Sequence, residues 1–168
     1  MNSLNFNNII RFFVLILAQV LIFNNINFMG CINPYPYILF ILLFPANNNR
    51  TLFIFISFML GLFVDIFSDS GGVHAASCVT IAFIRPAILK FAFGMIYEHQ
   101  NIKFNNTEFG NRVIYFSILI VIHHLLMFML EIFNISNIIL IAQKTLFSSV
   151  FTLILCILIS ILFSSKQR

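Results

Sequence analysis

The sequence predicts an all-α integral membrane protein, a single transmembrane domain over residues 1–168 that forms a bundle of about six helices. Of its 168 residues, 61% are hydrophobic and 8% are charged, and the mean hydropathy is +1.03. Soluble domains contain roughly 25% charged residues and 45–50% apolar ones. A globule of this length still exposes much of its surface, so lipid rather than water must solvate so many apolar side chains.

Five apolar segments have about the length that crosses a bilayer, which is roughly 20 residues. The first, 9–28, contains the run "FFVLILAQVLIF" directly after Arg11. The next two, 52–67 and 73–93, flank the turn "SDSGG", whose glycines can adopt positive φ and whose serine or aspartate can cap the following helix. The last two are 113–133 and 139–163, the latter interrupted by Gln143 and Lys144.

The second segment along the chain, "PYPYILFILLFP", is short, because Pro36 and Pro45 bracket only eight residues. Proline is tolerated in the first turn of a helix but removes a donor in its interior. The bracketed core covers about 12 Å of a hydrocarbon layer roughly 30 Å thick. This segment spans the membrane only if its flanks and neighbours contribute.

The basic residues predict the orientation, since short loops rich in Lys and Arg stay in the cytoplasm. Six spans place nearly all of them on one side, namely Arg11, Arg50, Lys90, Lys103, Arg112, Lys166 and Arg168. The turn "SDSGG" then lies outside, and Lys144 is the exception. Five spans would move the N-terminus outside, and both schemes leave the C-terminus in the cytoplasm. We favour six spans, with both termini cytoplasmic.

A polar motif interrupts the third and fourth segments. Asp65 lies near the end of one helix and His74 starts the next, so His74 is the nearest candidate partner for the buried carboxylate. Asn at this position is expected to keep most of the hydrogen bonding. Arg85 lies about 16 Å along the helix from His74, and Pro86 predicts a kink whose free carbonyls Arg85 could bind. The motif comprises Asp65, Ser70, Gly71, His74, Arg85 and Pro86.

Small residues at helical spacing predict that these two helices pack closely. One ridge carries Ser57, Gly61 and Asp65, and the other carries Ala75, Cys78 and Ala82. On the next helix, His124 and Glu131 share a face. Two interpretations of the polar groups stay open: hydrogen bonds that hold helices together, and a ligand or proton site.

No motif predicts an enzyme, a cofactor or a metal site. The three cysteines, Cys31, Cys78 and Cys156, are isolated and lie within or beside apolar segments, unlike a disulfide framework or a set of zinc ligands. The net charge of +4 is small and scattered, which excludes the basic face that nucleic-acid binding requires. The lipid bilayer is therefore the one environment that composition predicts directly.

The stretch "GLFVDIFSDSGGVHAA", followed by "IRP", resembles the bacterial rod shape-determining protein family MreD. The similarity extends to chain length, the short proline-flanked second segment and the basic C-terminus, and its specific part is 61–86. The resemblance implies a non-catalytic inner-membrane component of the cell-elongation machinery that makes peptidoglycan. Its implied partners are a single-span MreC-like protein, the MreB cytoskeleton, RodA and a transpeptidase.

The resemblance also implies an architecture like that of the six-helix substrate-binding components of energy-coupling-factor transporters. A second function therefore stays open, a solute-binding subunit of a vitamin transporter. Such a subunit needs a pocket with convergent polar groups, for which the sequence offers Arg85, His124 and Glu131.

Overall fold

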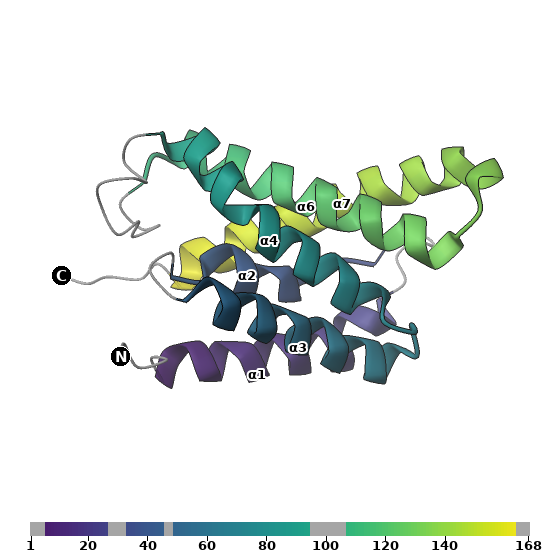
Figure 1. The fold of residues 1–168 in the computed structure, drawn as a ribbon, viewed down its shortest axis with the longest axis horizontal. Helices are drawn as coiled ribbons and strands as arrows, with labels where there is room; N and C mark the ends of the chain where they lie inside the picture. Colours follow the sequence, from purple (N-terminus) through teal and green to yellow (C-terminus); the bar gives the residue numbers. More distant parts are fainter. Residues whose placement is uncertain (1–5, 27–32, 46–48, 95–106, 164–168) are drawn as a thin grey trace.

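The computed structural model describes residues 6–26, 33–45, 49–94 and 107–163. All regular secondary structure in these ranges is helical, in a bundle of five long helices around a short one (Figure 1). The long helices are α1 (Phe6–Leu21), α3 (Arg50–Ser68), α4 (Val73–Phe93), α6 (Phe109–Ile132) and α7 (Ile138–Phe163). Short 3-10 turns, η1 (Phe23–Asn25) and η4 (Ile135–Asn137), follow α1 and precede α7.

Within the described ranges, five helical segments are long and apolar enough to cross a membrane, which makes this a multi-pass helical membrane protein. Four coincide with the expected segments to within a few residues, and the first runs through α1 and η1 over Asn8–Asn25. The second predicted segment differs. It forms η2 (Pro36–Ile38) and α2 (Leu39–Leu43), after which Phe44 is extended, so its helical part is too short to span alone.

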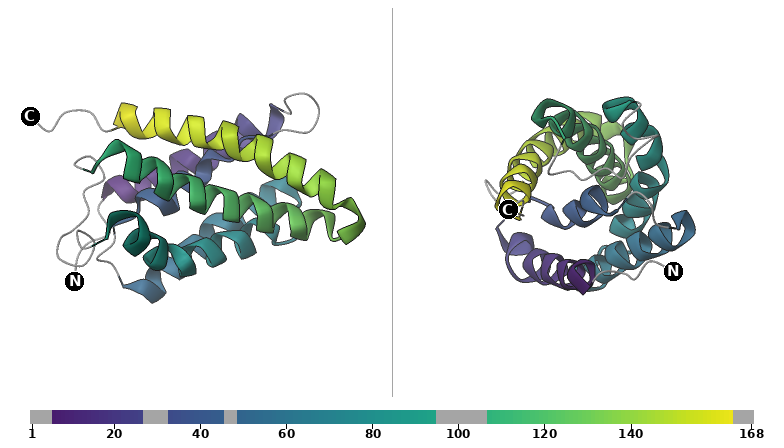
Figure 2. Two further views of the ribbon diagram at one scale, coloured as in Figure 1. Left: turned by 90° about the horizontal axis from the view of Figure 1, so that it is seen from above. Right: turned by 90° about the vertical axis from the view of Figure 1, so that its left-hand side faces the viewer.

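The long helices form an incomplete ring around α2. Consecutive helices α3, α4, α6 and α7 pack against one another in chain order, and α1 packs on α3. Seen along the bundle axis, α2 lies inside this ring (Figure 2, right). Tyr37 and Ile38 of η2 and Ile41 and Leu42 of α2 are fully buried. The apolar segment between the prolines is therefore the centre of the bundle and not a lipid-facing helix.

The chain enters α1 and leaves α7 at the same end of the bundle, while the α3–α4 and α6–α7 turns lie at the opposite end (Figure 1). This arrangement holds because the segment containing η2 and α2 returns the chain across the bundle. Although this segment is short, it carries the chain from one end of the bundle to the other. The chain therefore crosses the bundle an even number of times between α1 and α7.

Local conformations follow the sequence closely at the α3–α4 turn. Gly71 and Gly72 adopt φ values of +66° and +95°, as the turn "SDSGG" predicted. The expected interruption at Pro86 does not divide α4, which is a single helix from Val73 to Phe93. Arg50, rather than Arg85, binds a carbonyl in the turn before this proline, with Nη2 donating to the Phe83 oxygen at 3.3 Å.

Candidate functional site: a buried polar network around the central helix

Asp65 holds the close turn between α3 and α4. Its Oδ1 accepts hydrogen bonds from the Ser70 hydroxyl (2.5 Å) and the His74 backbone N–H (2.9 Å), and its Oδ2 accepts one from the Ala75 N–H (2.8 Å). These two amides belong to the first turn of α4, where they have no partner within the helix. The carboxylate of the preceding helix thus caps α4, and the partner of Asp65 is the His74 backbone rather than its ring.

The predicted role of Ser70 changes accordingly. The cap residue of α4 is Gly72, which has no side chain to bond the helix. The hydroxyl of Ser70 instead donates to Asp65 and helps to orient the carboxylate. A carboxylate that accepts three hydrogen bonds is the form of buried charge that proteins tolerate.

Directly beneath this cap, α3 and α4 come into backbone contact. A Cβ added to Gly61 would lie 2.5 Å from the Ala75 Cα and 2.6 Å from the His74 carbonyl oxygen. The two helices thus meet at Gly61 and Ala75, one residue from each of the two small-residue ridges. Ser57, Cys78 and Ala82 extend the ridges and are fully buried, and Ser57 donates back to the Phe53 carbonyl.

The ring of His74 points toward the central segment, which is the stretch 35–44 that contains η2 and α2. The Tyr37 hydroxyl lies 2.8 Å from His74 Nδ1 and 2.9 Å from Nε2 of His123 on α6. A hydroxyl has one proton to donate, so one ring accepts from Tyr37 and the other donates to it. Tyr37 thereby joins α4 and α6 through the middle of the bundle.

A second set of bonds ties α7 to the same segment. His124 Nδ1 lies 2.8 Å from the Ile120 carbonyl, which can only accept, so this nitrogen carries the proton. In the neutral ring Nε2 then accepts from the Thr152 hydroxyl at 3.1 Å, and Thr152 accepts from the Tyr35 N–H at 3.0 Å. His124 therefore faces the core, whereas Glu131 is exposed and pairs with Lys144 at 3.5 Å.

Arg85 fixes the other end of the central segment. Its Nε donates to the Tyr115 hydroxyl at 2.7 Å, and its Nη2 donates to the carbonyls of Leu42 (3.4 Å) and Phe44. Tyr115 also donates to the Leu42 carbonyl at 3.1 Å. These carbonyls lie where α2 ends and have no helical partner. A buried cation at a helix C-terminus also interacts favourably with the helix dipole, so Arg85 caps α2 rather than a kink in α4.

Three tyrosines of this network were not selected from the sequence: Tyr35, Tyr37 and Tyr115. A signal was present, because the chain has 23 Phe and only 4 Tyr. A tyrosine among so many phenylalanines in an apolar segment indicates that its hydroxyl has a partner. The repeated "PYPY" before the short segment marked two of them.

Five buried side-chain atoms in the described part of the chain have no hydrogen-bond partner. They are Gln19 Oε1, His123 Nδ1 and the hydroxyl oxygens of Thr145, Ser148 and Ser149. Three of them follow one face of α7, which also carries Thr152. Within the described ranges, no cluster of three or more His, Cys, Asp or Glu side chains could hold a metal ion.

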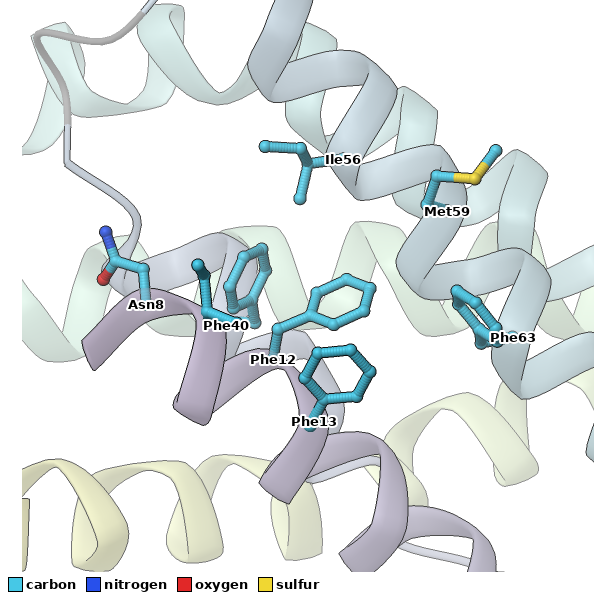
Figure 3. Close-up of a pocket in the computed structure, with 8 residues that line it drawn as sticks. Asn8, Phe12, Phe13, Phe40, Ile56, Met59 and Phe63 are labelled. Atoms are coloured by element: carbon cyan, nitrogen blue, oxygen red, sulfur yellow. The ribbon is translucent and has the colours of Figure 1, made fainter. Parts of the chain in front are cut away.

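Two clefts flank α1. One, of about 300 Å³, separates α1 from α3 and is almost entirely apolar (Figure 3); its lining residues are Asn8, Ile9, Phe12, Phe13, Phe40, Ile56, Met59 and Phe63. The other, of about 360 Å³, lies between α1, α2 and α7. Neither contains Asp65, His74, Arg85, His124 or Glu131. The polar network and the clefts are thus separate features.

No protein-family model matches the chain, and neither a curated protein nor a solved structure is similar enough to count as a match. Function therefore has to be argued from the residues and their arrangement.

Proposed function

We propose that this protein is a non-catalytic membrane scaffold of the bacterial cell-elongation machinery, with an MreC-like single-span protein as its direct partner. The observation that carries the proposal is the filled interior of the bundle. The central segment occupies the position in which a solute would bind, and its largest side chains, including Tyr37 and Phe44, are fully buried.

The bonding of the polar motif supports the same function. Asp65 and Arg85 are both buried, and each has several hydrogen bonds to backbone or side chains of neighbouring elements. Groups engaged in this way hold helices at fixed positions. They are not the convergent, available polar groups of a small-molecule pocket. A rigid bundle of this kind is suited to presenting an outer surface to other membrane proteins.

The placement of charge supports a cytoplasmic-membrane location with both termini in the cytoplasm. Arg50 begins α3, Lys90 lies in the last turn of α4, and Arg112 lies in the first turn of α6. These helix ends lie at the same end of the bundle as the start of α1 and the end of α7 (Figure 1). Positively charged ends stay in the cytoplasm. The chain crosses the bundle an even number of times, as it would in the six-helix substrate-binding components of energy-coupling-factor transporters.

Co-purification tests the proposed partnership. The protein is co-expressed with the MreC-like protein of the same organism, each with a different tag, and the membranes are extracted in mild detergent. We expect the pair to be retained on either tag. An unrelated single-span protein of equal length, expressed in the same way, is the control, and equal retention of that control would contradict the proposal.

The alternative is a solute-binding subunit of an energy-coupling-factor vitamin transporter. The unpartnered buried atoms of α6 and α7 favour it, since a bound ligand would supply the hydrogen bonds that they lack. Native mass spectrometry of the lone protein separates the two functions. The scaffold predicts no stoichiometric vitamin, whereas a one-to-one vitamin adduct without retention of the MreC-like protein would establish the transport function.

A further inference from the structure

Arg11 differs from the other basic residues that the structure describes, because it has no hydrogen bond or ion pair to another described residue. Six of the nine Lys and Arg residues lie in the described ranges, because Lys103, Lys166 and Arg168 fall outside them. Arg50, Arg85 and Lys144 bind a carbonyl or a carboxylate, and Lys90 and Arg112 also have interactions within the protein. Arg11 forms neither a hydrogen bond nor an ion pair in this part of the chain.

The position of Arg11 makes this isolation significant. It is half-buried and lies five residues after the start of α1, about 7.5 Å along the helix. An unpaired cation at this depth is costly unless its side chain reaches the interface or meets an anion. This end of α1 is also the basic end of the bundle, which faces the anionic leaflet in the orientation proposed above.

Arg11 lines the second cleft, which coincides with the gap in the ring of helices. The cleft lies between α1, α2 and α7, and its other lining residues are Ile10, Val14, Leu15, Leu39, Leu43 and Ile159. Every one of these is an aliphatic residue. The volume of about 360 Å³ is at the small end of the range for small-molecule sites. The cleft thus combines one cation with an apolar channel.

We propose that this cleft is a binding site for an anionic glycerophospholipid, with the phosphate on the Arg11 guanidinium and one acyl chain between α1 and α7. Charge complementarity selects a headgroup of net negative charge, because a zwitterionic headgroup places its own cation beside the phosphate. The guanidinium binds the phosphate itself through two parallel hydrogen bonds. The aliphatic lining accommodates the chain. The lipid would fill the cleft between α1, α2 and α7. It would thereby attach α1, the least buried of the five long helices, to α7.

The test is native mass spectrometry of the full chain in detergent, titrated with dioleoylphosphatidylglycerol or with dioleoylphosphatidylcholine. One cation near an anionic group favours the anionic lipid by about fivefold. We expect the wild-type protein to show at least this preference for its first bound lipid. Arg11→Gln should abolish it, Arg11→Lys should keep much of it, and millimolar inorganic phosphate should not displace the lipid.

Arg50→Gln is the matched control, because Arg50 lies at the same end of the bundle and already binds the Phe83 carbonyl. This variant should keep the wild-type preference. Val14→Trp keeps Arg11 but fills the cleft, so it should weaken binding of both lipids, and circular dichroism confirms that each variant is folded. Equal binding of the two lipids to the wild type, or equal loss of preference in Arg11→Gln and Arg50→Gln, would overturn the proposal. Displacement by inorganic phosphate would indicate an ion site instead.

Discussion

Replacing Gly61 by alanine is expected to destabilise the bundle, although alanine is the better helix former. A Cβ at this position would lie 2.5 Å from the Ala75 Cα and 2.6 Å from the Ala75 nitrogen. Ordinary carbon–carbon contacts are about 3.5–4.0 Å, so α3 and α4 would have to separate by about 1 Å or more. The obstructing atoms are backbone atoms, which cannot rotate away as a side chain can.

The magnitude follows from two opposing terms. Overpacking of a tight contact lowers the free energy of unfolding by about 1–3 kcal/mol. The intrinsic preference of a helix for Ala over Gly raises it by up to about 1 kcal/mol. Separation of the helices also lengthens the bonds from the His74 and Ala75 amides to Asp65. We therefore expect a net loss of about 1–3 kcal/mol for Gly61→Ala and a larger loss for Gly61→Val.

The measurement is unfolding of the purified protein in mixed micelles, followed by circular dichroism as the fraction of denaturing detergent rises. Gly110→Ala is the control, since Gly110 is also helical but a Cβ there would meet nothing within 4 Å. The control should be as stable as the wild type or slightly more stable. Equal stability of Gly61→Ala and Gly110→Ala would refute the close approach of α3 and α4.

Three further predictions concern the network and the orientation. Contrary to the expectation from the sequence, Asp65→Asn should lower the free energy of unfolding by about 1–3 kcal/mol, because both carboxylate oxygens accept backbone N–H groups and the amide nitrogen would face the Ala75 N–H as a second donor. Detergent unfolding measures this loss, and wild-type stability would contradict it. Tyr37→Phe should cost a similar amount, since both histidine rings lose their shared partner; an unchanged unfolding midpoint would exclude a stabilising role. In a cysteine-free background, a membrane-impermeant thiol reagent should label Ser136→Cys and not Glu108→Cys in intact spheroplasts, and the reverse pattern would invert the topology.

The sequence was sufficient for the long helices because each carries its own signal. Apolar length, flanking basic residues and the glycines of the "SDSGG" turn are local properties. The contact between α3 and α4 was also predictable, since small residues recur at helical spacing on each helix, at Ser57 and Gly61 on α3 and at Ala75 and Cys78 on α4. In these regions the elements that pack together are also consecutive in the chain, so local patterns are enough to predict their contact.

The central segment was predictable only in part, because its environment comes from distant residues. Its short length was clear from Pro36 and Pro45, but its burial depends on α1, α4, α6 and α7 packing around it. The carbonyl partners of Arg85 lie 43 and 41 positions earlier, at Leu42 and Phe44, and no spacing rule connects them to Arg85. Similarly, Tyr37 meets His74 and His123 through tertiary packing. Sequence reasoning selected His74 and Arg85 but assigned them to near neighbours in the chain, namely Asp65 and the carbonyls before Pro86, and it did not select Tyr37.

Depletion of the protein in the organism that encodes it tests the proposed scaffold function most directly, with cell shape as the readout. We expect depleted cells to lose the rod form and become round, and a wild-type copy supplied in trans to restore the rods. A copy carrying Gly61→Val should fail to do so, while Gly110→Ala should succeed. Rod-shaped depleted cells that have instead lost uptake of a vitamin would contradict the scaffold function.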